Sequence, residues 1–255
     1  MTALAPVFLR LPIAHRALHD AADGRPENSR AAIRAAVAAG YGIEIDLQPS
    51  RDGRAMVFHD PDLGRLTSEK GPVRARDAAE LAAIRLSGSD ETVPALSDVL
   101  ALVSGRVPLL VELKDQHGRL GETDGTLERA AADDIAAYDG PLALMSFNPH
   151  MVRRMATLAP GRARGLVTCA YAPRDWPDLP EQTRARLRDI ADYDAAGCSF
   201  VSHHAADLHR PRVAELRARG AAVLCWTIRS PEAEARARQV ADNITFEGYR
   251  AVIPA

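Results

Sequence analysis

Cysteine is scarce in this chain, which has three among 255 residues. Cys169, Cys198 and Cys225 are widely spaced and each stands beside a predicted strand, which fits buried thiols better than a disulfide framework. Long apolar runs are also missing, since none approaches the roughly 20 residues that a membrane-spanning helix requires. We therefore expect structural cysteines and no transmembrane segment.

An excess of charge of either sign is absent as well. Lys and Arg total 32 against 34 for Asp and Glu, which gives a formal net charge of -2. No strong field favours nucleic acid or an anionic membrane, so any anionic substrate must be met locally. The mildly apolar stretch 3–14 is interrupted by Arg10 and Pro12 and has no small-residue cleavage pattern. These features predict a cytoplasmic protein, and they do not indicate an oligomeric state.

What the chain does have is a repeated unit, in which short aliphatic runs alternate with longer Ala-, Arg- and Glu-rich segments of helical period. No composition shift or linker divides it, so residues 1–255 are expected to form one domain. Eight strands in about 250 residues predict a (β/α)8 TIM barrel, with a small insertion at 48–98 after strand two that holds a hairpin strand near Met56 and a helix near 77–84. We expect strands at 7–14, 42–47, 108–113, 142–145, 163–168, 199–201, 222–227 and 243–246, and helices at 29–39, 97–103, 126–138, 149–158, 180–195, 210–219 and 231–239. The short segment 247–255 suggests closure by a turn or by the N-terminal arm.

Two carboxylates stand out in the second predicted strand. Glu44 and Asp46 are two residues apart, so on a strand they point to the same side and repel each other. A hard divalent cation with oxygen ligands would relieve that repulsion. His59 follows a second apolar run and could act near the same ion. Taken alone, the pair could also be a solvent face or ion-pair partners, and His59 a capping residue.

The barrel prediction adds weight to these residues, because barrel active sites lie at the carboxyl ends of the strands. His15 and Arg16 end strand one, Glu112 and Lys114 end strand three, and Trp226 lies near the end of strand seven. One rim is thus expected to gather three carboxylates, two histidines, an arginine and a lysine. So many polar groups are not expected to reach strand ends by chance, so the set indicates a functional site.

The chain also resembles the glycerophosphodiester phosphodiesterases. The likeness is dense over residues 13–114 and weaker beyond. It rests on Ile13-Ala-His-Arg16, Pro26-Glu-Asn-Ser29, Gly42-Ile-Glu-Ile-Asp46, Asp52-Gly53, Val57-Phe-His-Asp60, Leu66-Thr67 and Val111-Glu-Leu-Lys114, with Ser146-Phe147 and Trp226-Thr227 further along. The resemblance implies a (β/α)8 barrel enzyme that uses a divalent metal, Mg²⁺ or Ca²⁺, to cleave a small glycerophosphodiester to sn-glycerol 3-phosphate and an alcohol.

The resemblance also implies roles for single residues. Glu44, Asp46 and Glu112 would be metal ligands, His15 and His59 the acid/base pair, and Arg16 and Lys114 phosphate contacts. Glu27 and Asn28 would reach the metal or brace its ligands. From the residues alone, Lys114 could instead pair with Glu112, and residues 27–28 could belong to a plain helix cap. Trp226 either packs on the glycerol carbons or belongs to ordinary barrel packing. For the acid/base pair, our hypothesis is that His15 works on the attacking side and that His59 protonates the departing alkoxide.

The sequence departs from the family pattern at two places. Ala17 replaces a usual Gly, so its backbone is expected to keep a conformation that a Cβ allows. Ile244-Thr-Phe-Glu-Gly248 replaces a usual Thr-Asp pair, which is expected to change the pocket wall and the substrate range.

Two alternative functions remain open. One alternative is phospholipase D-like cleavage of lysolipids or sphingolipids, whose known examples are secreted and disulfide-bonded. The other is a non-catalytic phosphate-binding barrel, which would be free to lose at least one histidine or carboxylate.

Overall fold

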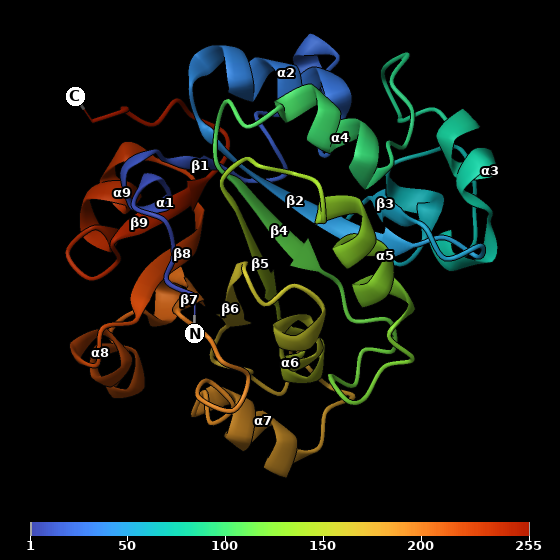
Figure 1. The fold of residues 1–255 in the computed structure, drawn as a ribbon. Coiled ribbons are helices and arrows are strands. Elements are labelled where there is room, and N and C mark those ends of the chain that lie inside the picture. Colours follow the sequence, from blue (N-terminus) through green and yellow to red (C-terminus); the bar gives the residue numbers. More distant parts are fainter. Residues whose placement is uncertain (1, 255) are drawn as a thin grey trace.

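Eight parallel strands close into a barrel in the computed structural model, which describes residues 2–254 (Figure 1). Closure occurs at β1, which pairs with β2 on one side and with β9 on the other. The barrel strands are β1 (Ile13–Ala14), β2 (Gly42–Pro49), β4 (Leu109–Leu113), β5 (Leu142–Ser146), β6 (Ala163–Thr168), β7 (Phe200–His204), β8 (Ala222–Ile228) and β9 (Asn243–Phe246). The predicted (β/α)8 barrel is confirmed.

Helices surround the barrel and connect successive strands (Figure 1). They are α2 (Arg30–Ala39), α4 (Leu96–Val103), α5 (Thr126–Ile135), α6 (Pro149–Leu158), α7 (Glu181–Arg188), α8 (Pro211–Ala218) and α9 (Pro231–Ala237). The first of them begins and ends where its sequence predicts: the Ser29 hydroxyl accepts from the Ala32 amide at 3.1 Å, and Gly40 stops the helix with φ 78°. Helix α7 is shorter than the predicted 180–195.

The prediction of a strand over 7–14 is wrong in its first half. Residues Val7–Arg10 form a short helix, α1, and only Ile13–Ala14 are in the sheet. The burial pattern explains the difference, because Phe8 is the one buried residue of this helix, and it packs with Leu4 in the apolar floor of the barrel. The Asn243 side chain of β9 holds this arm by donating to the carbonyl oxygens of Phe8 and Leu11, at 2.7 and 2.6 Å. The N-terminal arm therefore covers the lower end of the barrel.

The segment after β2 forms a lobe beside the barrel (Figure 1). Strand β2 runs on to Pro49 and pairs antiparallel with β3 (Ala55–Val57). The 3-10 turns Leu63–Arg65 and Val73–Ala75 and helix α3 (Ala78–Ala83) follow. A small core of its own holds the lobe together, built from Met56, Phe58, Leu63, Val73, Leu81, Leu86 and Val93. Because the lobe starts at the carboxyl end of β2, its polar residues stand at the rim.

Side chains alternate between the barrel interior and the helix layer. On β4, Leu109 and Val111 join the outer core, whereas Leu110 joins the inner one and Glu112 follows it on the same face. The interior is apolar at the bottom and polar at the top. This layering places buried carboxylates over a hydrophobic floor.

Two expectations from composition can be compared with the fold. All three cysteines are free, and burial raises the pKa of Cys198 and of Cys225 to about 12. Cys198 and Cys225 are therefore packing residues at neutral pH, whereas Cys169 is only half-buried. Among residues 2–254, none of the helices combines the length and the apolar character needed to cross a bilayer.

We expect Gly165→Ala to destabilise the barrel by about 1–3 kcal/mol, the usual cost of overpacking a core. A Cβ at Gly165 would lie 2.5 Å from the Phe200 ring and 2.6 Å from the Phe200 carbonyl oxygen. Urea unfolding monitored by circular dichroism measures the change. The matched control is Gly161→Ala, whose Cβ would meet no heavy atom of residues 2–254 within 4 Å, and its effect should stay within about 0.5 kcal/mol. Equal stability of the two variants would contradict the tight packing inferred here.

Candidate active site

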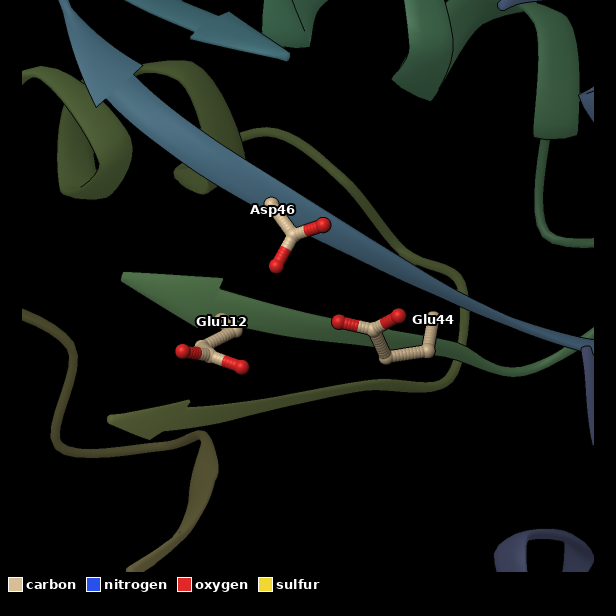
Figure 2. Close-up of side chains that lie close together, drawn as sticks. All are labelled: Glu44, Asp46 and Glu112. Atoms are coloured by element: carbon tan, nitrogen blue, oxygen red, sulfur yellow. The ribbon is translucent and has the colours of Figure 1, made fainter. Parts of the chain in front are cut away.

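Three carboxylates meet inside the barrel near the carboxyl ends of β2 and β4 (Figure 2). Glu44 and Asp46 lie on one face of β2, and the strand register sets Asp46 opposite Glu112 of β4. One oxygen of each lies within 4.8 Å of the others, and all three side chains are buried. The structure therefore brings together the three residues for which the sequence predicts a shared cation.

Two cationic side chains approach this carboxylate group. The Lys114 ammonium lies 2.9 Å from an Asp46 oxygen and 2.8 Å from a Glu112 oxygen, so the ion pair that the sequence left open is present. The Arg16 amide donates to Glu44 Oε2 at 2.8 Å, and its guanidinium Nε lies 3.7 Å from Asp46. Both cations come from strand ends, as the sequence predicts.

The three carboxylates differ in pKa because burial and neighbouring charges act on them to different extents. Burial, and then the charges of Asp46 and Glu112, raise the pKa of Glu44 well above its ordinary value. Burial also raises the pKa of Glu112. For Asp46 burial acts in the same direction, but the charges of Lys114, His59 and Arg16 and the hydrogen bond from Asn28 together outweigh it, and the pKa is lowered. More negative charge is thus gathered here than Lys114 alone balances.

The loop after β1 reaches these carboxylates through a strained backbone. Arg16, Ala17 and Asn28 have φ of 50°, 65° and 60°, in the left-handed region that favours glycine. The prediction that the Ala17 backbone keeps a conformation favourable for a residue with a Cβ is therefore wrong. Hydrogen bonds fix the loop, because the Ala17 amide donates to the Glu44 carbonyl at 2.9 Å and the Asn28 amide to the Arg16 carbonyl at 2.9 Å.

Asn28 and Glu27 have different positions in the site. The Asn28 side chain donates to Asp46 Oδ2 at 2.9 Å, and its oxygen accepts from the Asp46 amide at 3.3 Å. Asn28 thus holds Asp46 at both its carboxylate and its backbone amide. Glu27 lies outside the carboxylate group and pairs with Arg16 at 2.8 Å. The structure places Asn28 as a brace of a candidate ligand and Glu27 as a partner of arginine.

His15 stands at the rim with a carboxylate partner that sequence reasoning missed. Its Nδ1 lies 2.5 Å from Glu247 Oε2, just past β9. The hydrogen bond from His15 lowers the pKa of Glu247, so the carboxylate is ionised and the imidazole donates the proton. Arg229 also donates to Glu247, from Nε at 2.8 Å. The bond at Nδ1 leaves Nε2 of His15 as the nitrogen available for chemistry.

His59 has the same arrangement on the other side of the rim. Its Nδ1 lies 2.6 Å from Asp60 Oδ1. Hydrogen bonds from Arg65 and His59 outweigh burial and lower the pKa of Asp60 to about 2, so this carboxylate is also ionised and accepts. The Gln48 side-chain amide donates to the His59 backbone carbonyl oxygen at 2.9 Å and so connects the lobe to β2.

Both imidazoles are shifted towards the neutral form. Burial and the charge of Lys114 lower the pKa of His59 to about 4. Burial also lowers the pKa of His15, while the hydrogen bond to Glu247 opposes the shift. Each histidine can therefore accept a proton at neutral pH, and gains one more easily when a negative charge comes near.

A cavity of about 570 Å³, counted with the part open to solvent, lies among these groups. Most of its lining belongs to two chemical types, and Ser202, Thr227 and Thr245 are neutral polar residues beside them. The ionisable residues are His15, Arg16, Glu44, His59, Glu112, Lys114 and Arg229, and the apolar ones are Met145, Phe147, Val167 and Trp226, from β5, β6 and β8 and their ends. Trp226 is fixed by a hydrogen bond from its indole nitrogen to the Ser202 carbonyl at 3.0 Å. A small molecule with an anionic part and an uncharged part fits such a lining.

Two further histidines near the rim have packing contacts. His203 is fully buried and bonds the Thr168 hydroxyl at 2.7 Å and the Asp207 carbonyl at 3.1 Å, which joins the ends of β6 and β7. His204 packs against Trp226 with ring centroids 4.9 Å apart. Leaving both out of the sequence-predicted site agrees with these contacts.

Sequence reasoning missed Glu247, Asp60 and Arg65. A signal existed for the first two, since Glu247 follows a barrel strand and Asp60 adjoins His59 in the motif. Both were interpreted as part of a pattern and given no role. Arg65 has no such local signal, because its place depends on how the lobe folds against the barrel.

Comparison with known proteins agrees with this geometry. The family model described as Glycerophosphoryl diester phosphodiesterase family matches residues 15–243. An uncharacterized protein of Bacillus subtilis, YqiK, is 34% identical over 160 residues, which are 59% of this chain and 65% of YqiK. A glycerophosphodiester phosphodiesterase of Bacillus altitudinis is 38% identical over 96 residues, which are 35% of this chain and 39% of that protein. The chain thus matches about two thirds or less of the length of these two relatives.

A solved structure extends the likeness to the whole fold. The Oleispira antarctica phosphodiesterase, in complex with the product sn-glycerol-3-phosphate, has a TM-score of 0.75 and 25% identity, with 93% of each chain covered. The family match begins at His15, spans both histidines and all three carboxylates, and ends at the start of β9. The chain therefore belongs to the glycerophosphoryl diester phosphodiesterase family.

Proposed function

We propose that this protein hydrolyses glycerophosphodiesters to sn-glycerol 3-phosphate and an alcohol, with one divalent cation, Mg²⁺ or Ca²⁺, as cofactor. The observation that carries the proposal is the group of three buried carboxylates beneath a cavity with a histidine from each of two separate loops. The family match supports the reaction class. The product bound by the Oleispira relative supports the substrate class.

The carboxylates fit a divalent cation on chemical grounds. Within residues 2–254, Glu44 is fully buried yet has no ion pair with a side chain, and it accepts a hydrogen bond from a backbone amide. An unpaired buried carboxylate is costly, and repulsion from Asp46 and Glu112 adds to the cost. Six carboxylate oxygens in three residues are the hard donors that Mg²⁺ and Ca²⁺ prefer. We infer that Glu44, Asp46 and Glu112 are the ligands.

Arg16 and Lys114 would neutralise the phosphodiester together with the cofactor. A bound divalent cation supplies positive charge to a non-bridging phosphoryl oxygen. Arg16 can donate two parallel hydrogen bonds from its planar guanidinium, whereas Lys114 offers a compact point charge. Lys114 already contacts Asp46 and Glu112, so it can shift part of its bonding to a phosphoryl oxygen without leaving the site.

The histidines would move the protons. We assign His15 as the base that takes a proton from a water or from the substrate's own glycerol hydroxyl, and His59 as the acid that gives a proton to the alkoxide as the P–O bond breaks. In the free protein the pKa of His59 is about 4, because of burial and Lys114. The negative charge of the bound phosphodiester opposes this shift and favours the protonated form. Substrate binding would therefore favour the protonated form of His59, which a general acid requires.

The apolar side of the cavity gives Trp226 a place in substrate binding. Its ring contacts Phe147 with centroids 5.6 Å apart, and both line the cavity. We propose that Trp226 packs on the glycerol carbons while the charged side holds the phosphoryl group. The cytoplasmic location stays a prediction of the sequence.

Chelation should abolish hydrolysis of glycerophosphocholine, and added Mg²⁺ or Ca²⁺ should restore it, because three buried carboxylates lose their counter-charge. Release of glycerol 3-phosphate is the measurement, with lysophosphatidylcholine and sphingomyelin tested in parallel. Faster turnover of those lipids would favour the phospholipase D-like alternative. Full activity in excess EDTA would exclude the metal-dependent mechanism, and no turnover at all would favour a phosphate-binding barrel.

Glu44→Gln, Asp46→Asn and Glu112→Gln should each weaken cation affinity in a calorimetric titration and lower turnover by at least about 100-fold. Changes outside the ligand shell already cost about 10–100-fold in other metal sites, and a lost ligand should cost more. Glu128→Gln is the matched control, since Glu128 is equally buried but lies on α5 and contacts Thr123. Wild-type cation affinity in Glu44→Gln would contradict its role as a ligand.

The two histidines can be separated by leaving group. A general acid matters less when the leaving group departs unaided, so His59→Ala should keep far more activity on a p-nitrophenyl phosphodiester than on glycerophosphocholine. His15→Ala should be impaired on both substrates. Losses on the natural substrate should be on the order of 10²- to 10⁴-fold for either variant. Rescue of His15→Ala in place of His59→Ala would mean that the two roles are exchanged.

A further inference from the structure

Arg65 holds two carboxylates from different parts of the fold at once. It lies at the end of the 3-10 turn Leu63–Arg65 in the lobe after β2. Its Nε and Nη2 donate to the two oxygens of Asp60 at 2.5 and 2.9 Å. Its Nη1 and Nη2 donate to the two oxygens of Glu27 at 2.9 and 2.8 Å. The planar guanidinium of Arg65 thus donates four hydrogen bonds, two to each carboxylate.

Each of these carboxylates holds a residue that faces the cavity. Asp60 bonds Nδ1 of His59 at 2.6 Å, and Glu27 bonds Nη1 of Arg16 at 2.8 Å. Glu27 comes from the loop between β1 and α2, whereas Asp60 and Arg65 belong to the lobe. The guanidinium of Arg65 is therefore the link between the proposed acid and the proposed phosphate contact.

We propose that Arg65 is a positioning residue that sets His59 and Arg16 in register with each other through Asp60 and Glu27. The proposal rests on the proposed function, because it assigns Arg65 to the same phosphodiester site. Arg65 itself does not line the cavity. Its effect is to fix the orientation of the Asp60 carboxylate, and with it the Nδ1–H form of His59 that leaves Nε2 free for the substrate.

The contact differs from an ordinary surface ion pair. Exposed pairs are worth little, because solvent screens them and long side chains lose entropy. Here the carboxylates are mostly covered, with side-chain exposures of 11% for Glu27 and 21% for Asp60. Two bidentate forks also need the fixed geometry of a guanidinium. A lysine could neutralise the charge but could not make both forks.

The lobe contains a matched control in Arg51. Its guanidinium makes one fork on Asp77, with Nε and Nη2 at 2.8 and 2.6 Å from the two oxygens. It is 55% exposed, compared with 46% for Arg65, and its partner Asp77 is the N-cap of α3. Within residues 2–254 neither Arg51 nor Asp77 makes a hydrogen bond or ion pair with His15 or His59. Arg51 therefore shares the chemistry and the lobe of Arg65 without its link to the site.

The test compares Arg65→Ala and Arg65→Lys with Arg51→Ala and Arg51→Lys. Both Arg65 variants should lose about 10–100-fold in kcat/KM on glycerophosphocholine, as expected when a partner that orients a functional group is removed. Both Arg51 variants should stay within about threefold of wild type. In an Asp60→Asn, Glu27→Gln background the loss caused by Arg65→Ala should shrink to about threefold or less, because the two relays are already broken. Wild-type activity of Arg65→Lys, or an undiminished loss in that background, would overturn the proposal.

A readout without turnover separates this proposal from the proposed function. Nitrogen NMR of the histidine side chains, assigned with His59→Ala, should show His59 in the Nδ1–H form in the wild type and a mixture of both forms in Arg65→Ala. Thermal unfolding of each variant identifies any that is not folded, in which case Arg65→Lys carries the comparison. If the wild type has no phosphodiesterase activity, the proposed function fails while the NMR comparison still tests Arg65. An unchanged His59 form in folded Arg65→Ala and Arg65→Lys would refute the positioning role.

Discussion

Three carboxylates that cannot move apart are the constraint on which the site depends. Asp46 and Glu112 are register partners on hydrogen-bonded strands, and Glu44 shares the inward face of β2, so backbone geometry fixes their separation. Water cannot screen them, because all three are buried. The repulsion must be met by positive charge from the surrounding loops. That requirement explains why Lys114 and Arg16 point inward where a barrel core would otherwise be apolar.

Charges of opposite sign then alternate along a series that leaves the carboxylate group and returns to the cavity. From Asp46 the order is Arg16, Glu27, Arg65 and Asp60, which ends at His59. Each member is held on two sides, so a change at one place is felt along the series. The lobe after β2 adds three members to this order and has its own small core to support them. Its loops are thus built into the site, as is common for the long loops that follow barrel strands.

Most of the architecture could be predicted from periodicity, and the core of the site from its position at strand ends. Glu44 and Asp46 follow from strand alternation, which places inward residues two apart, whereas Glu112 follows from its place at the end of the next barrel strand and from the family resemblance. The errors have physical causes. Residues 7–14 are apolar enough for a strand, but residues Val7–Arg10 form a helix that buries Phe8 in the floor of the barrel. Glu247 and Arg65 depend on contacts across the closed barrel and the folded lobe, and no local pattern encodes such contacts.

Barrel closure at β1 and β9 has a consequence for the order in which the protein can assemble. His15 and Glu247 lie 232 positions apart in the chain, and the pairing of β1 with β9 brings them together. Contacts of such high sequence separation form late, because loop-closure entropy opposes them until the intervening units have folded. During synthesis the first seven barrel strands can pair while His15 still lacks its carboxylate. The proposed base, His15, therefore gains its carboxylate partner only when the barrel closes.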